Sequence, residues 1–157
     1  MGCEDDVWRT ALITLHAAAG LLAFVTGCVA MFRRSWFRPY LGSLIAMVVF
    51  LAAAVAADWA AANMALRVLF AGLGVLGVYL VWLAVQAGRV VGPTDPALSS
   101  RYRQRIGFTL VALFVGFVAI AILDIGAPSW VVAVVAALTA AAGHAVVRRL
   151  RARPVPV

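Results

Sequence analysis

Five runs of the sequence contain no Asp, Glu, Lys or Arg, and each run is 18 to 23 residues long. They comprise residues 10–32, 39–57, 68–88, 106–123 and 125–147. A transmembrane helix needs about 20 apolar residues, within a range of about 17–25. None of the runs alternates apolar with polar residues, as the strands of a membrane β-barrel do. The pattern predicts an all-α, five-helix integral membrane bundle that forms a single transmembrane domain over residues 1–157.

The composition excludes an ordinary water-soluble fold. Of the 157 residues, 66% are hydrophobic and only 12% are charged, whereas soluble domains have about 45–50% apolar and about 25% charged residues. A soluble domain of this size could not hide so much apolar surface. Membrane lipids are therefore the expected surroundings of the chain.

The arginines predict the orientation, because cytoplasmic loops of membrane proteins are enriched in basic residues. All 13 basic residues are Arg. With the N-terminus outside and the C-terminus in the cytoplasm, only Arg9 and Arg67 fall on the outer side. The same arrangement places Trp8, Trp59 and Trp130 at the outer interface and Trp36, Tyr40 and Tyr102 at the inner one.

The abundance of Ala and Val and the lack of Lys favour a bacterial source, which predicts a multi-pass protein of the inner (plasma) membrane. The net charge of +7 then records topology and predicts no nucleic-acid partner.

His16 lies inside the first run, and its helical neighbours Ala19, Gly20, Ala23 and Gly27 form a stripe of small residues. Such stripes let another helix approach closely, so His16 is expected to face protein. Two interpretations remain open: a hydrogen bond to a neighbouring helix, or ligation of haem. The second histidine, His144, lies near the inner end of the fifth run and is interpreted as an interfacial polar residue. The depths of the two histidines differ by about 20 Å, so one haem cannot bind both within a single chain, whereas two copies of the chain could pair His16 with His16.

Charged and polar residues at the outer ends of the predicted helices form a candidate polar cluster. Its members are Arg9, His16, Asp58, Asn63, Arg67 and Asp124. One interpretation is an outward-facing pocket for a small ligand or a partner loop. The other is that these charges mark the membrane boundary and pair weakly, at about 0–1 kcal/mol per surface pair.

Arginines on the cytoplasmic side are candidates for contact with lipid headgroups. They are Arg101, Arg103, Arg105, Arg148 and Arg149. Each basic residue near an anionic leaflet contributes about 1 kcal/mol, although their role as a topology signal is a sufficient explanation. Arg101, Arg103 and Arg105 lie at the end of the longest predicted link, which runs from Arg89 to Arg105 and contains the turn-forming residues Pro96 and Ser99.

Gly72, Gly74 and Gly77 have the spacing of a dinucleotide-binding motif. That motif requires a strand before it and a water-accessible crevice, but here it lies inside an apolar run. We interpret it as a packing or bending feature. Residues Ala133, Ala137 and Ala141 form another face of small residues in the fifth run.

The stretch Leu15-His16-Ala17-Ala18-Ala19-Gly20 resembles the first helix of small uncharacterised bacterial polytopic membrane proteins that carry His-x-x-x-Gly there. The resemblance covers the first helix only. It implies a membrane protein and does not indicate any specific activity. Such proteins often have a further basic, histidine-containing segment at the start of the second helix. In this chain the corresponding segment, 33–39, is basic and contains no histidine.

The absence of a catalytic constellation predicts a protein that is not an enzyme. The first hypothesis is an accessory subunit of a larger membrane complex or a self-associating small bundle, with a homo-oligomer as one form. The alternatives are a haem-binding or redox module that uses His16, and a small transport component. No charged residue lies deep inside a run, which counts against a proton-driven pump built from one chain.

Overall fold

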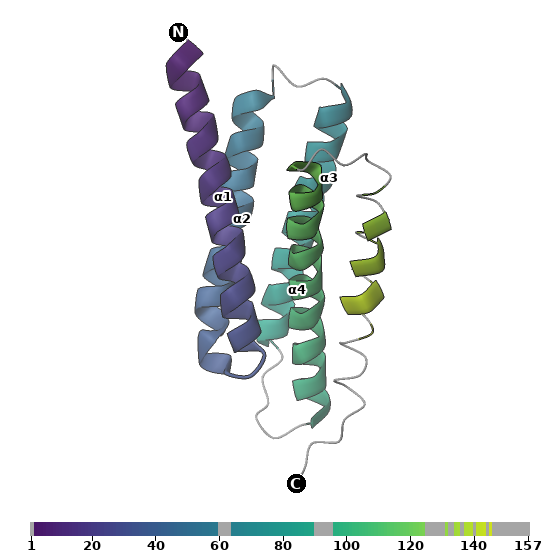
Figure 1. The fold of residues 1–157 in the computed structure, drawn as a ribbon. Helices are drawn as coiled ribbons and strands as arrows, with labels where there is room; N and C mark the ends of the chain where they lie inside the picture. Colours follow the sequence, from purple (N-terminus) through teal and green to yellow (C-terminus); the bar gives the residue numbers. More distant parts are fainter. Residues whose placement is uncertain are drawn as a thin grey trace. The chain divides into compact units, whose positions relative to one another are not determined.

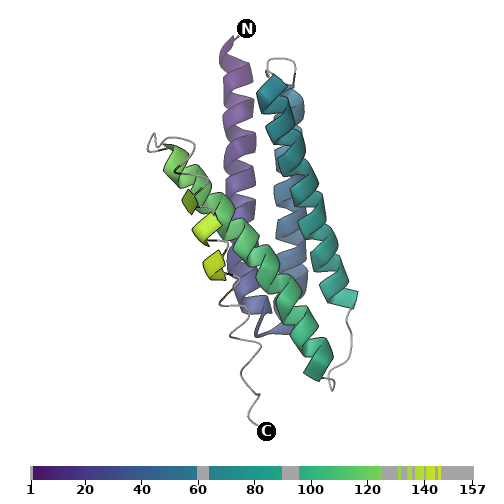
Figure 2. The same cartoon turned by 90° about the vertical axis from the view of Figure 1, so that its right-hand side faces the viewer.

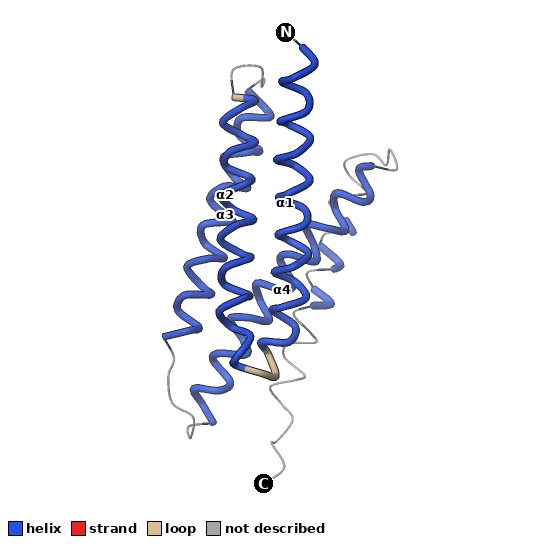
Figure 3. Tube along the Cα trace, turned by 90° about the vertical axis from the view of Figure 1, so that its left-hand side faces the viewer, coloured by secondary structure: helices blue, strands red, loops and turns tan. Residues whose placement is uncertain are grey.

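The structure, a computed structural model, describes residues 2–59, 64–89 and 96–124 and scattered positions between 131 and 145. The described residues are helical apart from short turns, and they include no strand (Figure 3). This confirms the all-α class. Three stretches of the described residues are long and apolar enough to cross a membrane: Thr10–Ala30, Arg34–Ala57 and Phe70–Arg89.

The helices follow the first four charge-free runs (Figure 1). They are α1 (Gly2–Ala30), the short 3-10 helix η1 (Arg34–Trp36), α2 (Phe37–Asp58), α3 (Met64–Arg89) and α4 (Pro96–Asp124). Each helix extends beyond its run into flanking polar residues, with one exception. The predicted first span reached residue 32, but α1 ends at Ala30 because Phe32 N–H and Arg33 N–H both donate to the carbonyl of Val29 and close the helix end.

The link between α3 and α4 is shorter than the predicted link from Arg89 to Arg105, because α4 already begins at Pro96. The sequence predicts turns at Pro96 and Ser99. In the structure, α4 begins at Pro96 and continues through Ser99 and Arg105 without interruption (Figure 2). Proline fits the first turn of a helix because the N–H that it lacks would have no intrahelical partner there. Arg101, Arg103 and Arg105 therefore project from a helix and not from a loop.

The chain forms two compact units, Met1–Val85 and Gln86–Val157. The boundary between them falls inside α3, so a single transmembrane domain stays a prediction. In the first unit, α1 and α2 lie side by side and are joined by the turn that contains η1 (Figure 1). The face of α1 that carries Ala19, Gly20, Ala23 and Gly27 is buried, and we call it the small-residue face.

The second helix contributes large side chains to the same unit. Tyr40, Leu44 and Met47 are buried at the i, i+4 and i+7 positions of α2, which place them on one face of the helix. The ring of Tyr40, predicted at the depth of the inner membrane interface, is buried within the protein, and its depth in a membrane stays a prediction. Tyr102 of α4 is likewise buried. Trp36, in contrast, remains exposed.

The glycines of α3 differ in their surroundings. A Cβ atom on Gly77 would lie 3.0 Å from a methyl group of Val48 in α2, whereas Cβ atoms on Gly72 and Gly74 would meet nothing within 4 Å. The packing interpretation of the glycine motif therefore holds at Gly77, where α3 approaches α2 closely.

The second unit contains α4 and the described part of the fifth run. Residues Tyr102, Ile106, Thr109, Leu110 and Leu113 are buried and form one stripe along α4. Of the predicted fifth span, 125–147, only scattered positions are described, and all of them are helical. One of them, Gly143, lies against α4, because a Cβ atom there would be 2.6 Å from both methyl groups of Val111. Among the three alanines of the predicted small face, Ala133 lies outside the described residues.

Candidate functional site

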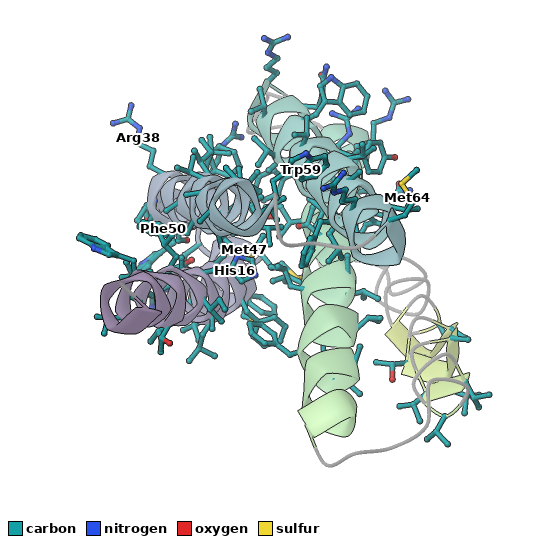
Figure 4. The ribbon with its side chains drawn as sticks, turned by 90° about the horizontal axis from the view of Figure 1, so that it is seen from above. His16, Arg38, Met47, Phe50, Trp59 and Met64 are labelled. Carbon is teal, nitrogen blue, oxygen red and sulfur yellow. The ribbon has the colours of Figure 1, made fainter. Side chains whose placement is uncertain are left out.

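His16 lies at the N-terminal end of the small-residue face of α1. Its Nδ1 atom is 2.8 Å from the backbone carbonyl oxygen of Met47 in α2, and Figure 4 shows the two residues together where α1 and α2 face each other. This is the hydrogen bond to a neighbouring helix that the sequence analysis set against haem ligation. The imidazole is half-buried.

The partner atom determines which ring nitrogen carries the proton. A carbonyl oxygen accepts hydrogen bonds and cannot donate them, so Nδ1 must be the donor. In a neutral imidazole the other nitrogen, Nε2, then holds a lone pair and can accept a hydrogen bond or bind a metal. A backbone carbonyl that fixes the tautomer in this way also occurs behind metal-bound histidines.

Two hydroxyl groups extend the polar contact between α1 and α2. The Oγ1 atom of Thr26 lies 3.4 Å from the Oγ atom of Ser43. Each hydroxyl has one proton, which it can donate either to the other hydroxyl or to a carbonyl of its own helix. The carbonyl is that of Leu22 for Thr26, at 2.5 Å, and that of Pro39 for Ser43, at 2.9 Å. These groups are satisfied within the protein, so they support packing between the two helices.

The predicted outer polar cluster is described only in part. Arg9, Asp58 and Asp124 lie in α1, α2 and α4, but their side chains are outside the described set, and Asn63 lies outside the described residues. Arg67 places its guanidinium carbon 5.6 Å from the ring centroid of Trp59, within the range of a cation–π interaction. Its Nε atom is buried and has no hydrogen-bond partner among the residues that the structure describes. The pocket therefore stays a prediction.

Trp59 is the residue that the sequence analysis did not place with Arg67. The sequence analysis predicts that Trp59 lies at the outer membrane interface. The only sequence feature that hints at its contact with Arg67 is its position beside Asp58, at the end of a predicted helix. The structure places the indole and the guanidinium together. Sequence spacing alone gives no direction for either side chain.

The predicted lipid-contact arginines behave in two ways. Arg101 and Arg103 are exposed on α4, whereas Arg105 is half-buried and donates from its Nη1 atom to the carbonyl of Gln86 at 2.6 Å. That carbonyl belongs to the last turn of α3, where four carbonyls have no intrahelical donor. A cation at this position also interacts favourably with the helix dipole, so Arg105 caps α3. Arg148 and Arg149 lie outside the described residues.

No group of three or more His, Cys, Asp or Glu side chains in the described part of the chain could hold a metal ion. His144 lies outside the described residues. The haem hypothesis concerns His16.

A comparison with protein-family models, with curated proteins and with solved structures finds no match to this chain. The functional interpretation therefore depends on the chain's own residues.

Proposed function

We propose that the chain is a non-enzymatic, multi-pass protein of the bacterial inner (plasma) membrane, acting as an accessory subunit or as a self-associating bundle. In this proposal five helices cross the bilayer, with the N-terminus outside and the C-terminus in the cytoplasm. The arginine distribution supports the orientation.

One observation carries the proposal. Within an apolar window of 18 residues in each of the three membrane-capable stretches, only 28%, 17% and 22% of the residues are buried inside the chain. Large apolar side chains such as Leu21, Leu22 and Val75 are exposed. Apolar patches of this extent are rare on soluble monomers, so lipid or a partner helix must cover them.

The first test is extraction of the membranes with alkaline carbonate, followed by measurement of the native mass in mild detergent. We expect the protein to stay in the membrane pellet and then to appear at an integer multiple of 16.6 kDa, or with an added polypeptide. Release by carbonate would contradict membrane integration. A reporter fused to the C-terminus tests orientation, and a periplasmic signal would reverse it.

The tautomer of His16 favours haem binding as a second candidate function. Nε2, which carries the lone pair in this tautomer, is the atom that would bind a haem iron. The test is the visible absorbance of the purified protein and its native mass, with roughly 0.6 kDa added per haem. A Soret band that disappears in His16→Ala would support this candidate, and a colourless wild-type protein of unmodified mass would eliminate it.

A further inference from the structure

The turn between α1 and α2 and the first turn of α2 display aromatic and basic side chains together. We call Phe32, Arg33, Trp36 and Arg38 the basic turn. Its backbone is fixed by hydrogen bonds from Phe32 N–H to the carbonyl of Val29 at 3.0 Å and from Trp36 N–H to the carbonyl of Arg33 at 3.0 Å. Its side chains therefore project from an ordered backbone.

All four side chains are exposed. Phe32 is 85% exposed and Trp36 is 44% exposed, and Arg33 and Arg38 are exposed beside them. Figure 4 shows the side chain of Arg38 extending away from α2. Exposure of a Phe ring to water is unfavourable, because apolar surface is more stable when it is removed from water.

The charge of the basic turn is not balanced by nearby carboxylates in its own unit. No Asp or Glu occurs between Asp6 and Asp58. These acidic residues belong to the opposite ends of α1 and α2, and α1 alone is 29 residues long, or about 40 Å at 1.5 Å per residue. The turn therefore presents positive charge to whatever lies next to it.

The helices on either side determine where the turn lies. It joins two membrane-capable stretches, Thr10–Ala30 and Arg34–Ala57. If both stretches cross the bilayer, the turn must lie at a membrane surface, whichever side that is. Aromatic rings prefer this depth, and guanidinium groups bind phosphate oxygens with two parallel hydrogen bonds.

We infer that the basic turn binds the headgroup phosphate of anionic phospholipids. Arg33 and Arg38 supply the charge and the hydrogen bonds, while Phe32 and Trp36 contact the glycerol and upper acyl region. This inference rests on the proposed membrane integration. It differs from the predicted headgroup contact of Arg101 and Arg103, which lie on α4 on either side of the buried Tyr102.

The experiment is native mass spectrometry of the full chain in mild detergent, titrated with phosphatidylglycerol and, separately, with phosphatidylcholine. We expect tighter binding of phosphatidylglycerol, a preference that inorganic phosphate at equal concentration does not abolish. The double variant Arg33→Gln with Arg38→Gln should weaken phosphatidylglycerol binding by about fivefold per arginine removed, which is the contribution of one basic residue near an anionic surface. Replacing both residues with Lys keeps the charge and should restore part of the affinity.

The matched control is Arg89→Gln with Arg153→Gln, which removes the same charge from residues outside both the basic turn and the candidate headgroup contacts and should change the affinity less than twofold. Equal losses in both double variants would overturn the inference, because binding would then follow net charge and not the turn. Unchanged affinity in the Arg33 and Arg38 variant would overturn it as well. Carbonate resistance of each variant is measured in parallel, so that a protein that stays in the membrane but shows no lipid preference disproves this inference alone.

Discussion

Helices α1 and α4 are both 29 residues long, but they bury opposite kinds of side chain. The buried face of α1 carries Ala, Gly and Thr, whereas the buried stripe of α4 carries Tyr102, Ile106 and Leu113. Small residues let two helix backbones approach, so the contact depends on the neighbour's side chains filling the groove. Large residues bring their own volume into the contact. The difference predicts that α1 is sensitive to added volume and α4 to lost volume.

The largest expected effect is from Ala23→Leu, at a side chain that is 0% exposed. Overpacking a close helix contact costs typically about 1–3 kcal/mol, and we expect about 3 kcal/mol here because α2 has no room to move without breaking the His16 and Thr26 contacts. The measurement is the free energy of unfolding in mixed micelles titrated with SDS. Ala18→Leu, on the exposed face of the same helix, is the control. Equal stability of the two variants would show that the small-residue face is not tightly packed.

Truncation of Ile106 tests the other side of the comparison. Its side chain is 0% exposed, and Ile→Ala in a core costs about 2–5 kcal/mol. We expect about 2 kcal/mol, at the low end, because the separated helix would still be surrounded by lipid. Ile106→Val should cost less than half as much in the same SDS titration. A cost for Ile106→Ala no larger than that of Leu21→Ala, on the exposed face of α1, would contradict the volume argument.

Gly143→Ala sharpens the comparison, because it adds one methyl group against α4. The new Cβ would lie 2.6 Å from both methyl groups of Val111, so we expect a loss of about 1–2 kcal/mol. Adding Val111→Ala should recover most of it, and the double-mutant cycle measures the coupling. Gly116→Ala is the control, because its Cβ would meet nothing within 4 Å. Additive single effects would mean that the two residues do not touch.

The smallest expected effect is at His16, the polar end of the small-residue face. His16→Leu removes the donor to the Met47 carbonyl and should cost about 1 kcal/mol, the upper part of the range for hydrogen bonds between membrane helices. His16→Asn places an N–H donor near the position of Nδ1 and should recover part of the loss. Unfolding in SDS reports both variants, and a Leu variant as stable as wild type would show that helix packing alone holds α1 to α2.

The sequence by itself determined the elements of this protein. Charge-free runs of bilayer length predicted the helices, because in lipid a backbone must satisfy its own hydrogen bonds and only apolar side chains are tolerated. The small-residue face beside His16 was also readable, since its i, i+3, i+4 and i+7 spacing places the residues together on any α-helix. These inferences depend on local composition and helix geometry alone.

The tertiary structure decided the partners. It directs His16 to the carbonyl of Met47, turns Arg105 from a predicted lipid contact into the cap of α3, and selects Gly77 from three similar glycines as the point of close approach. It also buries Tyr40 and Tyr102, although their sequence positions do not show which side chains pack inside the protein. The physical reason is that such contacts depend on the register and rotation of one helix against another. Apolar surfaces fit together in many registers, and only the sum of all their contacts selects one.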